Sequence, residues 1–374
     1  MVLYQLSYDP IRSRLQIKNR WQHCQKKTAW WLSEIFVRSS RGIRPYIGPV
    51  SASVPLVTII VPTRPGQTEV LALTACRALD YPREQLEIII ARGRQPAVQR
   101  NEALKIARGE LIYFLDDDSR PFPGNLRRAI SHFSRAEVKM LGGPNLCPPE
   151  APALEQVLAV ALGSWLAFGP SRARYAQLGK LRVSSEKELI LCNLVARRAS
   201  LLELGGFDES LYPNEENALM DDLQKNGGQL LYDPDLVVYR RPRPTLKAFC
   251  KMLLNYGRGR AEQFRLHPTF GSILNFVPPL FCLYLALLPF FWRGLPIRGA
   301  VAALTPLFVY AWAVSIQTLL SVSNHGFIKS VSALPLLVLT HLLYGLGFWR
   351  GLFTRLGNAR EHSPREVLLE RVTL

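Results

Sequence analysis

The sequence predicts an α/β domain with a parallel Rossmann-like sheet, followed by helices that cross a membrane. Short apolar, β-branched runs at residues 56–61, 86–90 and 112–115 alternate with segments whose apolar residues recur at helical spacing. Such alternation is typical of a parallel sheet covered by helices. Beyond residue 271 most apolar residues lie in long uninterrupted runs, which indicates that the last third of the chain is bound to a membrane.

The first half of the domain supplies three strands and two helices. Residues 56–61 read as a strand that is covered on both faces, and a turn follows at residues 62–66. We expect a helix over residues 69–79, a strand over 86–90, a polar loop over 92–96 and a helix over 97–107. The third strand, residues 112–115, runs directly into Asp116, Asp117 and Asp118. The three aspartates therefore lie at the carboxyl end of a buried strand.

The second half is less regular. A helix is expected over residues 125–133 and a strand over 140–142. Residues 154–168 predict an apolar helix of about 15 residues, which is short for a span of ~20 residues and favours a buried or interfacial position. A strand at 189–196, a turn at 205–207, a helix at 217–225 with glycines at its end, and a strand at 230–231 complete the domain.

Three long apolar runs without acidic residues follow, at residues 273–292, 300–322 and 331–349. Each approaches the length of a transmembrane helix, although Pro278 and Pro279 leave open a re-entrant or interfacial path for the first. Three crossings would place the C-terminal tail on the opposite side of the membrane from the cytoplasmic domain. The basic residues of the tail favour the cytoplasmic side instead, namely Arg350, Arg355, Arg360 and Arg365. The sequence therefore predicts membrane attachment and leaves the number of spans open.

Four regions are expected along the chain. Residues 1–50 form a basic and aromatic segment, 51–265 the α/β domain, 266–350 a membrane region of two to four helices, and 351–374 a basic tail. Within the first segment, residues 29–37 with Trp30 and Trp31 are either an interfacial helix or a helix packed on the domain.

The composition restricts the partners and the compartment. The formal net charge of +17 is scattered, and neither zinc-finger spacing nor an aromatic RNA-binding signature accompanies it, which argues against a nucleic-acid partner. Basic residues beside apolar runs indicate a surface that faces anionic lipid. The six cysteines show no paired spacing, so we expect them to be reduced. The first 15 residues lack the apolar stretch of a signal peptide, which predicts a cytoplasmic domain.

The three aspartates are the first candidate site. Open α/β sheets bind ligands beyond the carboxyl ends of their strands, and neighbouring carboxylates need a cation or hydrogen-bond donors nearby. Carboxylate oxygens suit Mg²⁺ or Mn²⁺, and Mg²⁺ is usually held by one or two carboxylates together with substrate phosphates. A solvated acidic turn is the alternative, but the buried strand before Asp116 favours a metal or nucleotide site.

Two further charged places accompany the aspartates. Glu215 and Glu216 open a predicted helix, where exposed N–H groups would stabilise a carboxylate; a general base would need desolvation as well, and a capping box is the alternative. Arg258 and Arg260 lie in YGRGR, a segment that we expect to be loosened by its glycines and suited to clamp a diphosphate. A positive collar beside the membrane is the alternative.

Together these stretches resemble the family 2 glycosyltransferases, which have the GT-A fold. The resemblance covers about residues 54–263 and rests on the order and spacing of VTIIVPTRPG, QRNEAL, YFLDDDSRPFPG, LGGFDES with NEENALMDDLQKNGG, and YDPDLVVYRRPRPTLKAF with NYGRGR. The last block, with apolar runs behind it, is similar to membrane-bound enzymes of exopolysaccharide assembly, such as succinoglycan-type transferases. The fold implied is a Rossmann-like mixed sheet with C-terminal transmembrane helices.

The resemblance also implies roles for single residues. The D-x-D motif falls on Asp116 and Asp118, with Asp118 the main metal ligand. The second acid of the family's E-D pair is the catalytic base and matches Glu216; because Glu replaces the usual Asp, Glu215 stays an alternative. The residues implied to contact the nucleotide sugar are Pro62, Thr63, Arg64, Asn101, Asp116, Asp117, Arg258 and Arg260.

The activity implied is inverting, metal-dependent sugar transfer from a nucleotide-sugar donor to a lipid-linked or saccharide acceptor in bacterial envelope or exopolysaccharide synthesis. The enzyme would lie in the bacterial inner membrane, in contact with its lipids. IIIARG lacks the acid that often follows the second strand in the family, which leaves the contact with a uracil base open. The Q-x-x-R-W signature of processive synthases is missing, so we expect single transfers. Two alternatives stay open: a metal-dependent nucleotidyl- or phosphotransferase, and a non-catalytic membrane scaffold.

Overall fold

The computed structural model describes residues 54–209, 211, 215–266, 270–294, 296–354 and 366–372. The segment at residues 1–50, with its expected helix at 29–37, lies outside the described residues, as do Arg355, Arg360 and Arg365.

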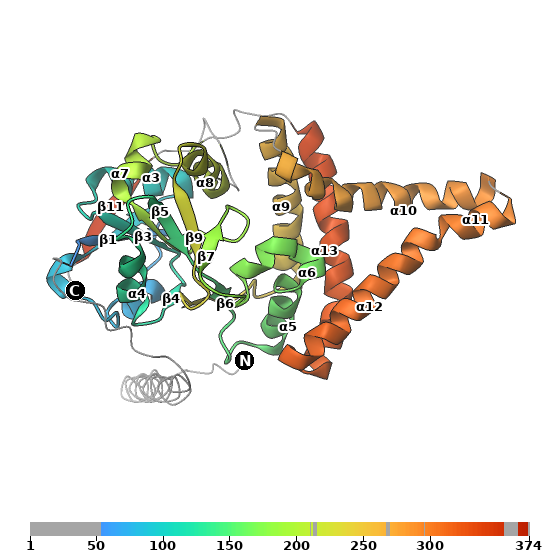
Figure 1. Cartoon of the computed structure of the whole chain (residues 1–374), viewed down its shortest axis with the longest axis horizontal. Coiled ribbons are helices and arrows are strands. Elements are labelled where there is room, and N and C mark those ends of the chain that lie inside the picture. The colour runs from blue at the N-terminus through green and yellow to red at the C-terminus, as the bar shows by residue number, and fades with distance from the viewer. Residues whose placement is uncertain are drawn as a thin grey trace, which may run out of the picture. The chain divides into compact units, whose positions relative to one another are not determined.

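An eight-stranded sheet forms the centre of the α/β domain (Figure 1). Its strand order is β11-β2-β1-β3-β8-β5-β9-β7. The strands are β1 (Val57–Thr63), β2 (Leu86–Arg92), β3 (Leu111–Leu115), β5 (Val138–Gly142), β7 (Arg182–Ser184), β8 (Asn193–Arg197), β9 (Gln229–Tyr232) and β11 (Leu368–Val372). A small second sheet has the order β4-β10-β6, formed by Arg120–Pro121, Val238–Tyr239 and Asn145–Leu146.

The sheet is mixed, which confirms the mixed GT-A sheet that the resemblance implies; the parallel arrangement expected from the alternation of strands and helices holds for only part of the sheet. Strands β1, β2 and β3 are parallel, as the alternation of strands and helices predicts. Strand β8 runs antiparallel to both β3 and β5. The connection from β5 to β8 starts and finishes at the same end of the strands, so β8 runs in the opposite direction to β5. The apolar pattern of a strand does not show this direction.

Helices cover both faces of the sheet. Val57, Ile59 and Val61 of β1 pack with α2 (Leu71–Cys76) and α4 (Asn125–His132) on one face. Ile60 of the same strand packs with α3 (Pro96–Ile106), α7 (Arg198–Glu203) and α8 (Glu215–Lys225) on the other. This alternation explains why the strand is apolar along its whole length.

The apolar segment at residues 154–168 is not one helix. It divides into α5 (Ala153–Leu162) and α6 (Trp165–Phe168), and the segment Trp165–Arg174 that begins with α6 is bent by 60° relative to α5. Gly163 and Ser164 form the break, and the Ser164 side chain accepts a hydrogen bond from the Ala167 N–H. Leu158 of α5 is fully buried with Phe249 and Leu337, so the expected buried position is confirmed for this part of the segment.

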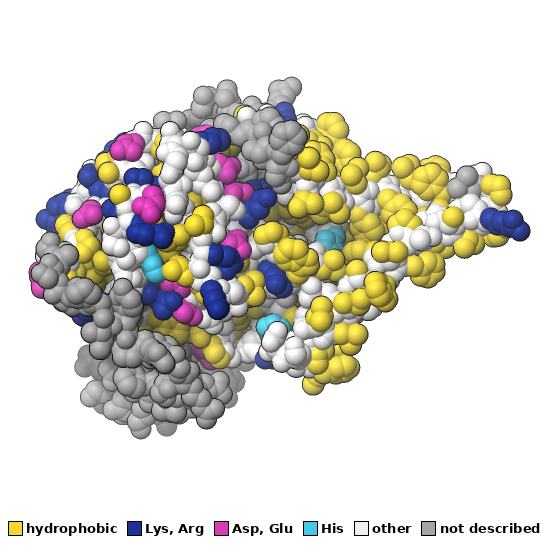
Figure 2. Space-filling view, viewed as in Figure 1, with side chains coloured by type: hydrophobic (Ala, Val, Ile, Leu, Met, Phe, Trp, Pro, Cys, Tyr) yellow, Lys and Arg dark blue, Asp and Glu magenta, His cyan; other side chains and the backbone are white. Residues whose placement is uncertain are grey.

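The C-terminal helices are α9 (Leu246–Leu266), α10 (Val277–Gly294), α11 (Ile297–Ala303), α12 (Thr305–His325) and α13 (Phe327–Phe353). Three segments, Ile273–Gly294, Ile297–His325 and Phe327–Phe353, are long and apolar enough to cross a membrane, which confirms three candidate spans. Hydrophobic side chains cover the visible surface of these helices (Figure 2).

Two features of the C-terminal part depart from expectation. The segment YGRGR lies inside the continuous helix α9, so its glycines do not loosen it. A carbon added at Gly257 would lie 2.0 Å from the Tyr344 carbonyl oxygen of α13, so this glycine permits close helix packing instead. Within the expected basic tail, β11 pairs antiparallel with β2, a strand that the local sequence pattern does not predict.

Candidate active site

The aspartate turn, Asp116 to Ser119, follows β3 directly. The Asp116 N–H donates to Ser119 Oγ over 3.1 Å, and the Ser119 hydroxyl donates to the Cys192 carbonyl oxygen over 3.2 Å. Ser119 is fully buried, so it fixes the turn against the start of β8. The structure therefore confirms that the three acids lie at the carboxyl end of a buried strand.

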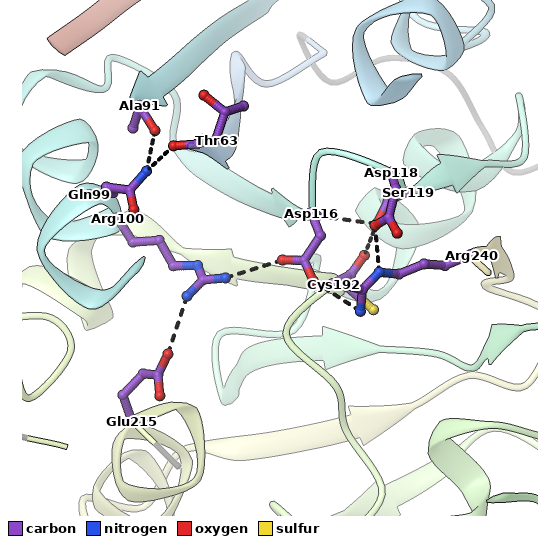
Figure 3. Close-up of polar contacts among 10 residues, drawn as sticks. All are labelled: Thr63, Ala91, Gln99, Arg100, Asp116, Asp118, Ser119, Cys192, Glu215 and Arg240. Atoms are coloured by element: carbon purple, nitrogen blue, oxygen red, sulfur yellow. Dashed lines mark hydrogen bonds and ion pairs between the residues drawn. The ribbon is translucent and has the colours of Figure 1, made fainter. Parts of the chain in front are cut away.

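Two arginines that are absent from the predicted site contact the aspartates (Figure 3). Arg100 Nη2 lies 3.2 Å from Asp116 Oδ1, and Arg240 Nη1 lies 3.1 Å from Asp116 Oδ2. The Arg240 Nε–H also donates to Asp118 Oδ1 over 2.5 Å. Arg100 precedes Asn101 in QRNEAL, and Arg240 follows the short strand VVY. Arg240 is recognisable in the sequence as a basic residue directly after the apolar run LVVY, for which no strand is predicted.

The arginines make the aspartates chemically unequal. Burial favours a raised pKa at Asp116, but Arg240, Arg100 and Arg243 outweigh it and lower the pKa of this carboxyl. At Asp118 burial is the larger effect, and Asp116 and Asp117 add to it, so the pKa is raised despite Arg240. The Asp117 carboxylate has a different partner, because it accepts a hydrogen bond from the Gln67 side-chain amide.

The chemistry of the donor set fits a divalent ion that is shared with a phosphate. Carboxylate oxygens of Asp116 and Asp118 converge on one guanidinium, so the pair already surrounds a cationic group. In the described part of the chain, no three His, Cys, Asp or Glu side chains are grouped to hold an ion by themselves. One or two carboxylates completed by phosphate oxygens and water are the usual ligands of Mg²⁺.

Arg100 links Glu215 to the aspartate turn, because it forms ion pairs with both Glu215 and Asp116. Its carboxylate Oε1 lies 3.3 Å from Arg100 Nη1, and both residues are buried, with 3% and 5% of their surface exposed. Glu216 is the next residue of α8 and is half-buried. Successive helical residues point about 100° apart, so the two glutamates face different surroundings.

The ends of β1 and β2 are tied together beside the aspartate turn. The Gln99 side-chain amide donates to the carbonyl oxygens of Thr63, over 2.8 Å, and of Ala91. Thr63 is 4% exposed, and its Oγ1 has no hydrogen-bond partner among the described residues. Pro62 is half-buried and Arg64 is exposed. The predicted nucleotide contacts thus include a buried hydroxyl that has no hydrogen-bond partner in the part of the chain that the structure describes.

The side-chain amide of Asn101 is hydrogen-bonded to other residues of the protein through both its nitrogen and its oxygen. Its amide donates to the Phe207 carbonyl oxygen and to Glu209, and accepts from the Phe207 N–H over 2.8 Å. Gly206 has a φ of 83°, and a carbon added there would lie 2.4 Å from Asn101 Oδ1. Asn101 therefore holds the GGFDE loop, and its contact with a nucleotide sugar stays a prediction.

Arg258 and Arg260 find partners on their own helix. Arg258 Nε lies 3.5 Å from Glu262, and Arg260 Nη1 donates to Gln263 over 3.0 Å. In the region that the structure describes, no ion pair or hydrogen bond links either arginine to the aspartate turn. Their contact with a diphosphate stays a prediction.

A pocket of about 360 Å³ opens beside the aspartate turn. Asp118, Arg240, Arg241 and Arg243 contribute charged groups to its lining. Apolar side chains from the neighbouring helices complete it, namely Ala159 and Leu162 of α5 and Phe249 and Met252 of α9. The pocket thus combines a charged part with an apolar part.

Comparison with known proteins relates these features to one group of enzymes. A sequence profile described as glycosyl transferase family group 2 matches residues 111–349. The chain is 27% identical over 175 residues to a pre-mycofactocin glycosyltransferase of Mycobacterium tuberculosis, covering 46% of this chain and 36% of the relative. It is 28% identical over 203 residues to the succinoglycan biosynthesis protein ExoA of Rhizobium meliloti, covering 53% of this chain and 56% of the relative. The matches thus span about half or less of these relatives.

A solved structure shares the fold. The mannosyltransferase PcManGT from Pyrobaculum calidifontis, solved in complex with GDP-Man and Mn²⁺, superposes with a TM-score of 0.52 at 14% identity. The match covers 82% of this chain and 92% of that protein. At this identity the likeness concerns the fold.

Proposed function

The chain belongs to glycosyl transferase family group 2, and on this basis we propose that it transfers a sugar from a nucleotide-sugar donor to a lipid-linked acceptor. The observation that carries the proposal is the pocket in which Asp118 and Arg240 face apolar residues of α5 and α9. Its charged part suits a diphosphate, and its apolar part suits the hydrophobic portion of an acceptor. A saccharide acceptor without lipid would use the charged part alone.

The donor nucleotide is proposed to lie across the ends of β1 and β3. The buried Thr63 hydroxyl without a partner supports a ligand there, with Pro62, Arg64, Asn101 and Asp117 as further predicted contacts. Arg240 is added to Arg258 and Arg260 as a group that stabilises the departing nucleotide, because it already contacts Asp118. Guanidinium groups bind phosphate oxygens through two donors at once.

Asp118 and Asp116 are the residues that would hold Mg²⁺ or Mn²⁺ with the donor. When bound, such an ion stabilises negative charge that develops on the leaving phosphate. The solved relative that was crystallised with Mn²⁺ supports a divalent ion in this fold. Arg240 would then have to release at least one carboxylate, which leaves its guanidinium free for phosphate oxygens.

Glu216 is proposed to be the general base. It accepts the proton of the acceptor hydroxyl while that oxygen attacks the anomeric carbon and the bond from this carbon to the diphosphate breaks. A single displacement of this kind inverts the anomeric centre. The ion pair of Glu215 with Arg100 supports this division of roles, because Glu215 is already engaged and almost fully buried.

The test uses membranes that contain the full chain, a panel of radiolabelled nucleotide sugars and organic extraction of the product. We expect label in the lipid fraction with one donor, one sugar per acceptor, and loss of the signal in Asp118→Asn. Asp235→Asn is the matched control, because Asp235 is an exposed aspartate paired with Arg128.

Each alternative predicts another result. Transfer of phosphoryl or nucleotidyl groups without sugar would identify a nucleotidyl- or phosphotransferase. If nucleotide with Mn²⁺ leaves the thermal stability unchanged and no donor is consumed, the chain is a scaffold, since a ligand that binds the folded state must raise its stability.

A further inference from the structure

The chain returns to its starting sheet after the apolar helices. Strand β11 follows α13 and pairs with β2 over five residue pairs, from Leu368 with Arg92 to Val372 with Ile88. Two ion pairs tie the same strands, Arg92 with Glu370 at 3.1 Å and Arg371 with Glu87 at 3.3 Å. The segments before α10 and after α13 therefore belong to one folded domain.

This return restricts how the chain crosses a membrane. A domain lies on one side of a bilayer, so the chain must cross an even number of times between α9 and β11. Three candidate spans lie in that interval, and all three cannot be complete crossings. We propose that α10 and α12 cross the bilayer as a two-pass hairpin joined at α11, and that α13 lies at the membrane surface against the domain. The inference does not depend on the proposed activity.

The packing of α13 supports its assignment to the surface. A carbon added at Gly347 would lie 2.2 Å from the Leu254 carbonyl oxygen, and one at Gly351 would lie 2.4 Å from the Arg258 carbonyl oxygen. The spacing Gly347-x-x-x-Gly351 thus places α13 directly on the backbone of α9. Helix α9 is too polar for the hydrocarbon region, since it carries Lys247, Lys251, Arg258, Arg260, Glu262 and Arg265.

The two hairpin helices have the opposite character. Only 6% and 11% of the residues in their most apolar windows are buried in the protein, against 39% for α13. Large apolar side chains stand exposed along both, with Phe290 71%, Phe308 69% and Trp312 69% exposed. Such surface needs a non-aqueous partner, and the many hydrophobic side chains seen over the projecting helices in Figure 2 fit the hydrocarbon region of a bilayer.

The dimensions of the hairpin match a bilayer. Helix α10 has 18 residues and α12 has 21. At 1.5 Å per residue they are ~27 Å and ~32 Å long, close to the ~30 Å of a hydrocarbon core. Both lead away from α9 and α13 to the turn at α11 (Figure 1). Trp292 and Arg298 are exposed at this turn, and Trp side chains are enriched where a helix meets the membrane interface.

Cysteine accessibility tests the topology. In a full-length background with all native cysteines replaced, single cysteines are introduced as Asp235→Cys in the domain, Arg298→Cys at the turn, and Ile328→Cys and Phe353→Cys at the two ends of α13. The last two positions are 79% and 81% exposed. A membrane-impermeant maleimide is added to spheroplasts before and after permeabilisation. We expect labelling of Arg298→Cys before permeabilisation and of the other three only afterwards.

Two results would overturn the hairpin. Labelling of Phe353→Cys on the side opposite to Asp235→Cys means that α13 crosses, and labelling of all four positions on one side means that nothing crosses. If a cysteine variant does not accumulate, fusions to the C-terminus of the unmodified chain decide the same question. We expect a fluorescent protein there to fluoresce and alkaline phosphatase to be inactive, and the reverse pattern contradicts the proposal.

Discussion

At the scale of residues, Asp118 shares its carboxylate with Arg240, whereas Asp117 turns to Gln67 and its carbonyl oxygen accepts from the Ala72 N–H. Asp116 lies between Arg100 and Arg240. Three identical neighbours in sequence therefore have three surroundings. Arg240 contacts the carboxylates of Asp116 and Asp118, and these are the two residues that the D-x-D motif predicts as metal ligands.

Substitution of Asp118 and of Asp117 separates the roles of these two aspartates. We expect Asp118→Asn to lower the transfer rate by about 10²–10³-fold, because it removes a group that acts where charge develops, and Asp117→Asn to change it only a few-fold. Initial rates at saturating donor, with thermal melts to check folding, are the measurement. Equal losses in both variants would show that the register taken from the family resemblance is wrong.

The adjacent glutamates allow a similar comparison. Glu216→Gln should lower kcat by about 10²–10⁴-fold with unchanged stability, as expected for a general base. Glu215→Gln should instead destabilise the protein by about 1–3 kcal/mol, because it removes the charge of one of the two carboxylates that pair with buried Arg100. Chemical unfolding and kcat are measured for both. A large kcat loss with unchanged stability in Glu215→Gln would assign the base to Glu215.

The lowered pKa of Asp233 leads us to expect that the free energy of unfolding depends on pH in the acidic range. Burial opposes ionisation, but hydrogen bonds from His132 and Arg128 outweigh it and lower the pKa from 3.8 to about 2. A lowered pKa stabilises the fold above pH ~4 and loses this effect as pH falls towards 2. The difference corresponds to about 2 kcal/mol.

Asp233→Asn should therefore reduce the free energy of unfolding by about 2 kcal/mol at pH 7 and flatten its fall between pH ~4 and 2. Urea unfolding across this range is the measurement. Asp235→Asn, at a neighbouring exposed carboxylate, serves as the control and should keep the slope. An unchanged slope in Asp233→Asn would contradict the assignment.

At the scale of elements, the joint between α9 and α13 depends on the absence of side chains. Gly257 of α9 and Gly347 of α13 each lie against the backbone of the other helix. In the sequence, Gly257 in YGRGR is expected to loosen the chain, because a glycine gives no local sign of what it packs against. Only the approach of the two helices shows that both glycines strengthen the structure.

A glycine pair tests this joint. Gly347→Ala should destabilise the protein by about 1–3 kcal/mol, as overpacking does, because the new carbon would lie 2.2 Å from the Leu254 carbonyl oxygen. Gly294→Ala meets nothing within 4 Å and should be neutral or slightly stabilising. Thermal melts in detergent compare the two. Equal melting temperatures would mean that α9 and α13 separate at low cost.

At the scale of the whole molecule, β11 joins the end of the chain to the sheet next to β2. It covers an edge that would otherwise present unpaired N–H and C=O groups. If the apolar helices cross a membrane, as we propose, this pairing also requires an even number of crossings between α9 and β11. The arginine-rich tail and the three apolar runs, which conflict in sequence, become compatible if α13 does not cross.

Removal of the last strand tests this closure. A chain that ends at residue 365 should lose stability and expose β2, with a melting temperature lowered by about 2–4 °C for each kcal/mol lost. Glu370→Gln, which removes one half-exposed ion pair, should cost less than about 1 kcal/mol. Thermal melts and aggregation assays are the measurement. A truncated chain as stable as the full one would show that β11 contributes nothing to the sheet.

The sequence by itself determined the buried strands, the aspartate turn at the end of β3, the glutamates at the start of α8, three apolar helices and the family. These features follow from apolar periodicity, turn residues and motif spacing, which act over a few neighbouring residues. Arg100, Arg240, the direction of β8, the pairing of β11 and the glycine joint were decided by tertiary structure. Arg240 meets Asp118 across 122 positions, and such contacts depend on how segments approach one another in space rather than on their own composition.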